Sequence, residues 1–200
     1  MAAGSGIRSV SRMKGRAEMK EIRIGKARLQ FMVGDITAQD TEAVVNAANK
    51  QLAPGGGVAG AIHRASGPGL WEECRKLGGC ETGEAKISGG HDLPNTYVIH
   101  TVGPVYSATK NDAVLLRSCY VNSLKVAEKN KIRSVSFPAL STGIFGYPVD
   151  KAAYVAIKAI KEYLEGATDI EFVRMVLYDK GAYDEHLRAL DAVNAGVDIS

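Results

Sequence analysis

Segments with the periodicity of strands alternate with segments of helical periodicity from residue 21 almost to the end of the chain. We predict strands over residues 21–24, 29–33, 43–46, 85–88, 97–101, 134–138 and 172–178. We predict helices over residues 57–65, 69–77, 112–130, 149–164 and 183–193. In the helix over 112–130 the apolar stripe is expected to comprise Val114, Leu115, Leu124 and Ala127. Such alternation predicts an α/β fold, a three-layer α/β/α sandwich with a largely parallel central sheet.

Charge is distributed unevenly along the 200 residues. Residues 1–20 hold five of the 25 basic residues but one of the 22 acidic residues, so the formal charge of +3 becomes −1 for the rest of the chain. We interpret residues 1–20 as a basic, disordered N-terminal extension and residues 21–200 as a single domain. A nucleic-acid-binding arm or a targeting peptide is the alternative for residues 1–20. Beyond them the chain has no basic stripe, so nucleic acid is not an expected partner of the domain.

Several classes of protein are excluded by what the sequence lacks. There is no run of about 18 apolar residues and no secretory signal, so we expect no membrane contact and a cytoplasmic location. The cysteines are odd in number and none stands in a C-x-x-C pair, which argues against a disulfide framework. No pair of the four histidines has metal-ligand spacing, so we expect no metal site, and we interpret His100 as a hydrogen-bonded core residue.

Two glycine-bearing segments each leave a predicted strand and enter a predicted helix. The first glycine loop, residues 46–60, contains Gly55, Gly56 and Gly57 in succession, and the second glycine loop, residues 141–148, reads STGIFGYP. Glycines let the backbone approach a ligand closely, and the free N–H groups where a helix begins favour an anion. If both loops lie at the same sheet edge, they are suited to hold a diphosphate from opposite sides, with the hydroxyls of Ser141 and Thr142 as added donors.

Residues 55–60 also satisfy the pattern G-x-G-x-x-G, which raises the possibility of a dinucleotide cofactor. That motif requires its glycines directly after the strand, whereas residues 47–54 intervene here. No Gly-Lys-Ser/Thr follows the glycines, so a P-loop is absent as well. We therefore expect neither a bound cofactor nor ATP hydrolysis.

Further polar and aromatic residues stand where the ends of a nucleotide would lie. Asp35 follows a predicted strand and is suited to accept a hydrogen bond from an exocyclic amine, although Gly-Asp also commonly forms a turn. Tyr178 ends the last predicted strand, where its ring can stack on a base or simply complete the core. Asn46 and Asn49 carry amides that can both donate to and accept from sugar hydroxyls.

Five segments of the chain occur in the order found in a known family: residues 33–37 (VGDIT), 45–49 (VNAAN), 55–62 (GGGVAGAI), 98–104 (VIHTVGP) and 138–146 (PALSTGIFG). On these segments the chain resembles the macrodomain family, which binds ADP-ribose, over residues 21–195. The resemblance implies a mixed central sheet flanked by helices. It also implies that ADP-ribose and ADP-ribosylated molecules are the partners.

The resemblance assigns a role to each part of the expected site. Asp35 would hold the adenine amine, Ile36 would add a backbone contact, Tyr178 would cover the base, and Asn49 would contact the distal ribose, while the two glycine loops hold the diphosphate. The residues expected to contact the ligand are Asp35, Ile36, Asn46, Asn49, Gly55, Gly56, Gly57, Val58, Ser141, Thr142, Gly143, Ile144, Phe145, Gly146 and Tyr178.

Members of this family include readers of ADP-ribosyl marks and hydrolases that act on mono-ADP-ribosyl esters, O-acetyl-ADP-ribose or ADP-ribose 1″-phosphate. In one hydrolytic class an aspartate follows Gly-Gly-Gly-Val, where this chain has Ala59, and in another a histidine precedes the glycines, where this chain has Pro54. Neither side chain can act as a general base. We therefore expect slow hydrolysis by a water held between the diphosphate and the distal ribose, with Asn49, Gly57 and Phe145 as the catalytic residues. A reader without catalysis is the alternative.

Overall fold

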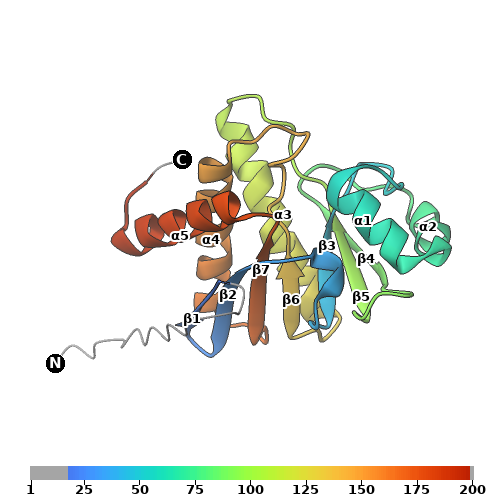
Figure 1. Ribbon diagram of the computed structural model, residues 1–200, viewed down its shortest axis with the longest axis horizontal. Helices are drawn as coiled ribbons and strands as arrows, with labels where there is room; N and C mark the ends of the chain where they lie inside the picture. Colours follow the sequence, from blue (N-terminus) through green and yellow to red (C-terminus); the bar gives the residue numbers. More distant parts are fainter. Residues whose placement is uncertain (1–17, 199–200) are drawn as a thin grey trace.

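The computed structural model of the protein describes residues 18–198 (Figure 1). Within that range the strands are β1 (Met19–Ile24), β2 (Ala27–Val33), β3 (Ala43–Ala47), β4 (Ala85–Gly89), β5 (Tyr97–Thr101), β6 (Ser134–Phe137) and β7 (Phe172–Leu177). They form one sheet in the order β1-β2-β7-β6-β3-β5-β4. The strands from β2 to β5 in this order are parallel, whereas β1 and β4 pair antiparallel with their neighbours at the two edges. The expectation of a mixed, largely parallel sheet is confirmed.

Helices cover both faces of this sheet (Figure 1). They are α1 (Gly57–Ser66), α2 (Pro68–Cys74), α3 (Lys110–Lys129), α4 (Val149–Glu165) and α5 (Lys180–Ala195), with short 3-10 turns η1 (Ile36–Ala38) and η2 (Arg75–Leu77). The helices α3, α4 and α5 share one apolar core with the sheet, and α1 and α2 share a second core on the opposite face. The predicted three-layer α/β/α sandwich is therefore present, and no helix in residues 18–198 is long and apolar enough to cross a membrane.

The strand periodicity explains why both faces need a helical cover. Val45 on β3 faces the core under α3 and α4, whereas its neighbour Val44 faces α1 and α2. On β5, Ile99 and Val98 are divided in the same way. Because successive side chains of a strand point to opposite faces, a central strand that is apolar at every position must be buried on both sides.

Three details differ from the expectations drawn from the sequence. Val114 is not part of the α3 stripe, because its side chain is 60% exposed; the buried positions include Leu116 and Tyr120 instead. The predicted helix over residues 69–77 is interrupted, since α2 ends at Cys74 and η2 follows. The ordered body begins before residue 21, with residues 19 and 20 in β1, while the disorder predicted for residues 1–17 lies outside the described residues.

A buried tyrosine connects α3 to the segment that leads into the second glycine loop. The Tyr120 hydroxyl accepts a hydrogen bond of 3.3 Å from the backbone N–H of Leu140, in the interior of the protein. The Tyr120 ring also packs at a tilt against Phe137, with 5.2 Å between ring centroids. Because water does not reach this site, the Leu140 amide depends on the tyrosine for its hydrogen bond.

We expect Tyr120→Phe to lower the free energy of unfolding by about 1–3 kcal/mol, because it leaves a buried amide without an acceptor. Urea denaturation measures this difference. Tyr154→Phe is the matched control, since that hydroxyl has no hydrogen-bond partner within residues 18–198 and its removal is expected to change stability little. Equal stabilities of the two variants would contradict the assignment.

Candidate functional site

Four neighbouring parallel strands deliver the predicted site residues to one edge of the sheet. In the order β2-β7-β6-β3, the carboxyl ends lead respectively to Asp35, Tyr178, the second glycine loop and the first glycine loop. Parallel strands end on the same side, so all four segments meet along the edge where α/β folds bind ligands. The expectation that both glycine loops share one sheet edge is confirmed.

The first glycine loop presents open backbone donors where α1 begins. Gly57 has φ of +54°, a left-handed conformation that favours glycine. Gly60, one turn into α1, lies so close to the loop that a Cβ added to it would be 2.3 Å from the carbonyl oxygen of Gly55. Among the described residues no acceptor meets the N–H groups of residues 55–57, which are exposed. The start of this ten-residue helix therefore offers an anion both free donors and a favourable dipole.

Asn49 shapes the same loop from within. Its Nδ2 donates to the carbonyl oxygen of Ala53 at 2.9 Å, and its Oδ1 accepts from the N–H of Ala53, also at 2.9 Å. An amide of this kind has two donor hydrogens and two acceptor lone pairs, so one of each is still open to a sugar hydroxyl. The side chain is half-buried beside Gly55, next to the open N–H groups. Asn49 is thus placed both to fix the loop and to face a ligand.

The second glycine loop is closed at its base and open at its tip. The N–H of Tyr147 donates to the carbonyl of Ser141 at 3.0 Å, and the N–H of Gly146 donates to the carbonyl of Gly143 at the same distance. Within residues 18–198 the amides of residues 142–145 meet no acceptor, and Ile144 is 100% exposed. The turn therefore presents consecutive free donors on the surface, as the first loop does.

The hydroxyls of this loop do not serve as the expected surface donors, which corrects the sequence analysis. Ser141 is 6% exposed and its Oγ has no partner among the described residues. The Oγ lies over Gly103, where an added Cβ would come within 2.1 Å of it. Thr142 donates its hydroxyl to the carbonyl of Ala139 at 3.2 Å. Ser141 has a positive φ of +65°, a conformation that is uncommon for residues other than glycine.

Asn46 also departs from its expected role as a ligand contact, because it is fully buried. It pairs in register with His100 of β5, and its Nδ2 lies 3.1 Å from the His100 Nδ1. The His100 Nε2 is 2.8 Å from the Oγ of Ser88. Burial lowers the pKa of His100 to about 3, so the ring is neutral; Asn46 then donates to Nδ1, and Nε2 donates to Ser88. The interpretation of His100 as a hydrogen-bonded core residue is confirmed.

The opposite end of the edge carries the residues predicted for a nucleobase. The Asp35 carboxylate accepts from the N–H and the hydroxyl of Thr37 at 2.8 and 2.7 Å, both through Oδ1. These bonds, the backbone one first, lower the pKa of Asp35, so it is an ionised acceptor at neutral pH with Oδ2 open to solvent. Ile36 buries its side chain in the α1/α2 core, and Tyr178 is 94% exposed. A planar group lying between Asp35 and Tyr178 would be met by a carboxylate and by a ring.

One structural contributor to the site was missed in the sequence. Tyr106, in the segment between β5 and α3, donates its N–H to the carbonyl of Phe145 at 2.9 Å and so holds the second glycine loop from outside. The segment 98–104 contributed to the resemblance, but its residues had no role assigned. The signal in the sequence is the pair Gly103-Pro104 directly after a predicted strand, because Gly-Pro marks a turn. Such a turn leads into the segment that contains Tyr106.

Comparison with known proteins places this arrangement in a family. The Macro domain family model matches residues 45–156. A macro domain-containing protein of Chlorobaculum tepidum is 52% identical over 159 residues, which cover 79% of this chain and 92% of that protein. The human ADP-ribose glycohydrolase MACROD2 is 55% identical over 133 residues, which cover 66% of this chain but 31% of that longer protein.

Solved structures agree with the sequence relatives. The macrodomain of Oceanobacillus iheyensis with ADP matches with a TM-score of 0.87 at 36% identity, covering 92% of this chain and 100% of that one. The Trypanosoma brucei macrodomain in complex with ADP-ribose matches with a TM-score of 0.76 at 37% identity, covering 81% of this chain and 68% of that one. With the family model, the close relatives and the shared architecture in agreement, this chain belongs to the macrodomain family.

Proposed function

We propose that this protein binds ADP-ribose and slowly hydrolyses ADP-ribose adducts. The observation that carries the proposal is the convergence of two sets of free main-chain N–H groups, from the glycine loops after β3 and β6, at one edge of the sheet. A diphosphate is the ligand group that such paired donors fit best, because each set can neutralise one phosphate. The family members solved with ADP and with ADP-ribose support this assignment.

Each end of the ligand has a counterpart beside the diphosphate site. Asp35 accepts a hydrogen bond from the adenine amine, the Ile36 amide adds a backbone contact, and Tyr178 covers the base. At the other end Asn49 contacts the distal ribose through the part of its amide not engaged with Ala53. Gly55, Gly56, Gly57 and Val58 with Thr142, Gly143, Ile144, Phe145 and Gly146 form the main-chain contacts.

Hydrolysis in this site has to proceed without a side-chain base at positions 54 and 59 of the first loop. Ala59 is buried and apolar, and Pro54 has no titratable group. A water positioned between the diphosphate and the distal ribose attacks C1″ of a mono-ADP-ribosyl ester as the C1″–O bond breaks and the modified side chain leaves as a carboxylate. The proton of the water passes to the diphosphate, while Asn49 orients the sugar and the amides of Gly57 and Phe145 stabilise developing negative charge. The lack of a general base typically costs a factor of about 10²–10⁴ in rate, so turnover is slow. The relatives named as ADP-ribose glycohydrolases support the reaction class.

A reader of ADP-ribosyl marks is the second candidate function. Ala59 and Pro54 favour it, because they remove side chains used in hydrolytic classes but leave the main-chain donors intact. The reader and the slow hydrolase share every binding residue, so only a measurement of turnover separates them. The cytoplasmic location and the processing of ADP-ribose 1″-phosphate belong to the same proposal.

Replacing Asp35 tests recognition of the adenine. We expect Asp35→Ala to weaken ADP-ribose binding by about 10- to 100-fold, because a hydrogen bond to a charged acceptor is lost. Isothermal titration calorimetry measures the affinity. Asp191→Ala, at an exposed position on α5, removes the same charge elsewhere and is expected to bind as the unmodified chain does. Unchanged affinity of Asp35→Ala refutes the adenine assignment.

Replacing Gly60 tests the main-chain diphosphate site. The added Cβ of Gly60→Ala would clash with the Gly55 carbonyl and displace the open amides, so we expect an affinity loss of about ten-fold or more. Gly166→Ala, where α4 ends, is the control, since the atom nearest to its added Cβ is the Tyr163 carbonyl oxygen at 3.3 Å and its φ of −78° suits alanine. If both variants bind ADP-ribose equally well, the shape of this loop does not determine affinity. Circular dichroism verifies that each variant is folded.

Introducing a carboxylate at position 59 tests the catalytic argument. We expect Ala59→Asp to release ADP-ribose from a mono-ADP-ribosylated protein at least about ten-fold faster than the unmodified chain, because it adds a base beside the water. Ala59→Asn, of the same size but without a base, is expected to give no gain. Release undetectable in the unmodified chain at full ADP-ribose occupancy establishes the reader function instead.

A further inference from the structure

A hollow lies beside the second glycine loop and is lined by residues to which no contact with ADP-ribose has been assigned. It has a volume of about 470 Å³ and opens between the segment that enters α3 and the first turns of α4. Tyr106 and Tyr147 form an aromatic pair in its wall, with ring centroids 4.8 Å apart, and Lys110 and Lys151 also line it. Both elements follow strands whose carboxyl ends lie at the edge of the glycine loops.

The wall of this hollow is attached directly to the second glycine loop. The N–H of Tyr106 donates to the carbonyl of Phe145 at 2.9 Å, and the N–H of Tyr147 donates to the carbonyl of Ser141 at 3.0 Å. The loop that is proposed to hold the diphosphate thus has the hollow on its far side. The hollow and the second glycine loop are therefore parts of one connected surface, joined through Phe145 and Ser141.

The charge of the hollow favours an anion. No acidic side chain lines it. Lys50, Lys161 and Lys180 form ion pairs, whereas Lys110 and Lys151 form none with the carboxylates of residues 18–198. Asp112 on α3 is ionised, because hydrogen bonds from Ser107 and Thr109 lower its pKa, and its charge acts on Tyr147 in the wall; the two lysines outnumber this one carboxylate. Two exposed ammonium groups therefore have no partner of opposite charge here.

We propose that this hollow binds an acidic side chain of the polypeptide that carries the ADP-ribosyl group, next to the modified residue. The inference rests on the proposed function, and it assigns to that site a preference for ADP-ribosylated segments rich in aspartate and glutamate. Carboxylates complement the two lysines, and the half-buried Tyr106 is the ring of the wall that is open to the methylene groups beside them. An acidic peptide fits better than a nucleic acid, because residues 21–200 carry a net charge of −1 and the Tyr147 ring is buried, not available for stacking.

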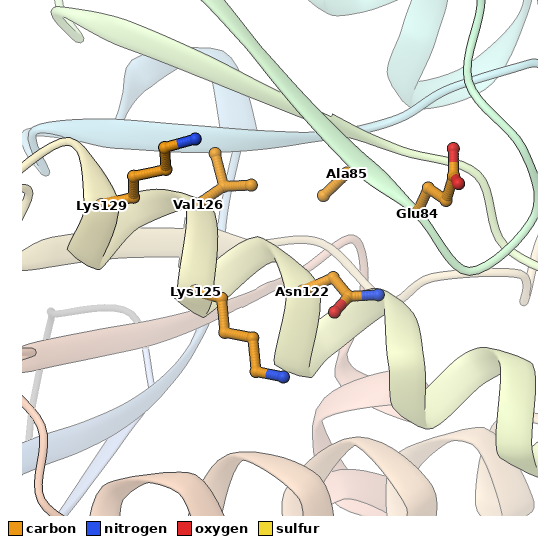
Figure 2. Close-up of a pocket in the computed structure, with 6 residues that line it drawn as sticks. All are labelled: Glu84, Ala85, Asn122, Lys125, Val126 and Lys129. Atoms are coloured by element: carbon orange, nitrogen blue, oxygen red, sulfur yellow. The ribbon is translucent and has the colours of Figure 1, made fainter.

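A second basic groove supplies the matched control. It has a volume of about 420 Å³ and is lined by Lys125 and Lys129 of α3 together with Glu84 (Figure 2). Figure 2 shows these lysines on the helix and Glu84 and Ala85 on the facing strand segment. This groove contains the carboxylate of Glu84, and no residue of the glycine loops lines it. Removing Lys125 and Lys129 therefore lowers the net charge of the protein by as much as removing Lys110 and Lys151, but leaves the hollow beside the second glycine loop unchanged.

The experiment compares two mono-ADP-ribosylated peptides, one flanked by glutamates and one by glutamines, each joined through a linkage that water does not cleave. For the full unmodified chain we expect the glutamate peptide to bind about 3- to 10-fold more tightly, from two partly exposed ion pairs. In the double variant Lys110→Gln/Lys151→Gln the preference is expected to disappear, while the affinity for free ADP-ribose is unchanged. Lys125→Gln/Lys129→Gln is expected to keep the preference.

Other outcomes overturn the inference in distinguishable ways. Equal binding of both peptides by the unmodified chain, with free ADP-ribose still bound, refutes the acidic preference alone. Loss of free ADP-ribose binding in Lys110→Gln/Lys151→Gln assigns the hollow to the ADP-ribose site itself. If the Lys125→Gln/Lys129→Gln control loses the preference equally, the preference is an effect of net charge and not of this hollow. If the chain binds a 5′-phosphorylated oligonucleotide more tightly than the acidic peptide, the partner is a nucleic acid. Failure of the unmodified chain to bind free ADP-ribose refutes the proposed function instead.

Discussion

The parallel pairing of β3 with β6 is the constraint on which the site depends. These two strands pair with each other at only two positions, Ala43 with Val135 and Val44 with Ser136. Their other sides are paired throughout, β3 with β5 and β6 with β7, and each strand then leads into its own glycine loop. This early separation creates room at the carboxyl edge for a ligand between the loops. A slip by one residue would reverse which face each side chain of β3 occupies, so the two apolar cores fix the register that brings the loops together.

Beneath the loops, buried polar groups hold the ends of these strands in place. Asn46, His100 and Ser88 form a chain of hydrogen bonds between β3, β5 and β4, just before the first loop departs. The neutral His100 ring accepts from Asn46 at Nδ1 and donates to Ser88 at Nε2. A charged ring carries a proton on both nitrogens, so it could not accept from Asn46. Polar networks in a core are stabilising only when their members are satisfied, and they specify one arrangement where apolar side chains would tolerate several. In this network the Asn46 Oδ1 has no partner among the described residues, so the chain of hydrogen bonds orients the amide and the ring without satisfying every atom.

The sequence was informative about the fold because periodicity and parallel topology are read from many residues at once. The apolar patterns predicted strand ends at residues 33, 46, 138 and 178, each within one residue of the observed end, and their meeting at one edge follows from the parallel order. Individual side-chain roles were less predictable. Asn46 is the type of residue that binds sugars, but its strand register with His100 determines its partner, and that register is a long-range property. The Ser141 hydroxyl is likewise buried over Gly103, a contact between segments far apart in the sequence that the residue type does not indicate.

Recognition built from main-chain amides separates binding from catalysis in this site. No substitution that keeps the loop conformation removes a backbone N–H group, apart from proline, so the diphosphate contacts tolerate change at neighbouring side chains. Position 59 lies in the first turn of α1 beside Gly55 and its open amides. In the proposed mechanism, a side chain at this position would contact the attacking water. Alanine at position 59 leaves the main-chain N–H donors of the first glycine loop intact and provides no group that can accept a proton. Affinity and turnover are therefore free to vary independently in this architecture, because the first resides in the backbone of two loops and the second depends on one or two side chains beside them.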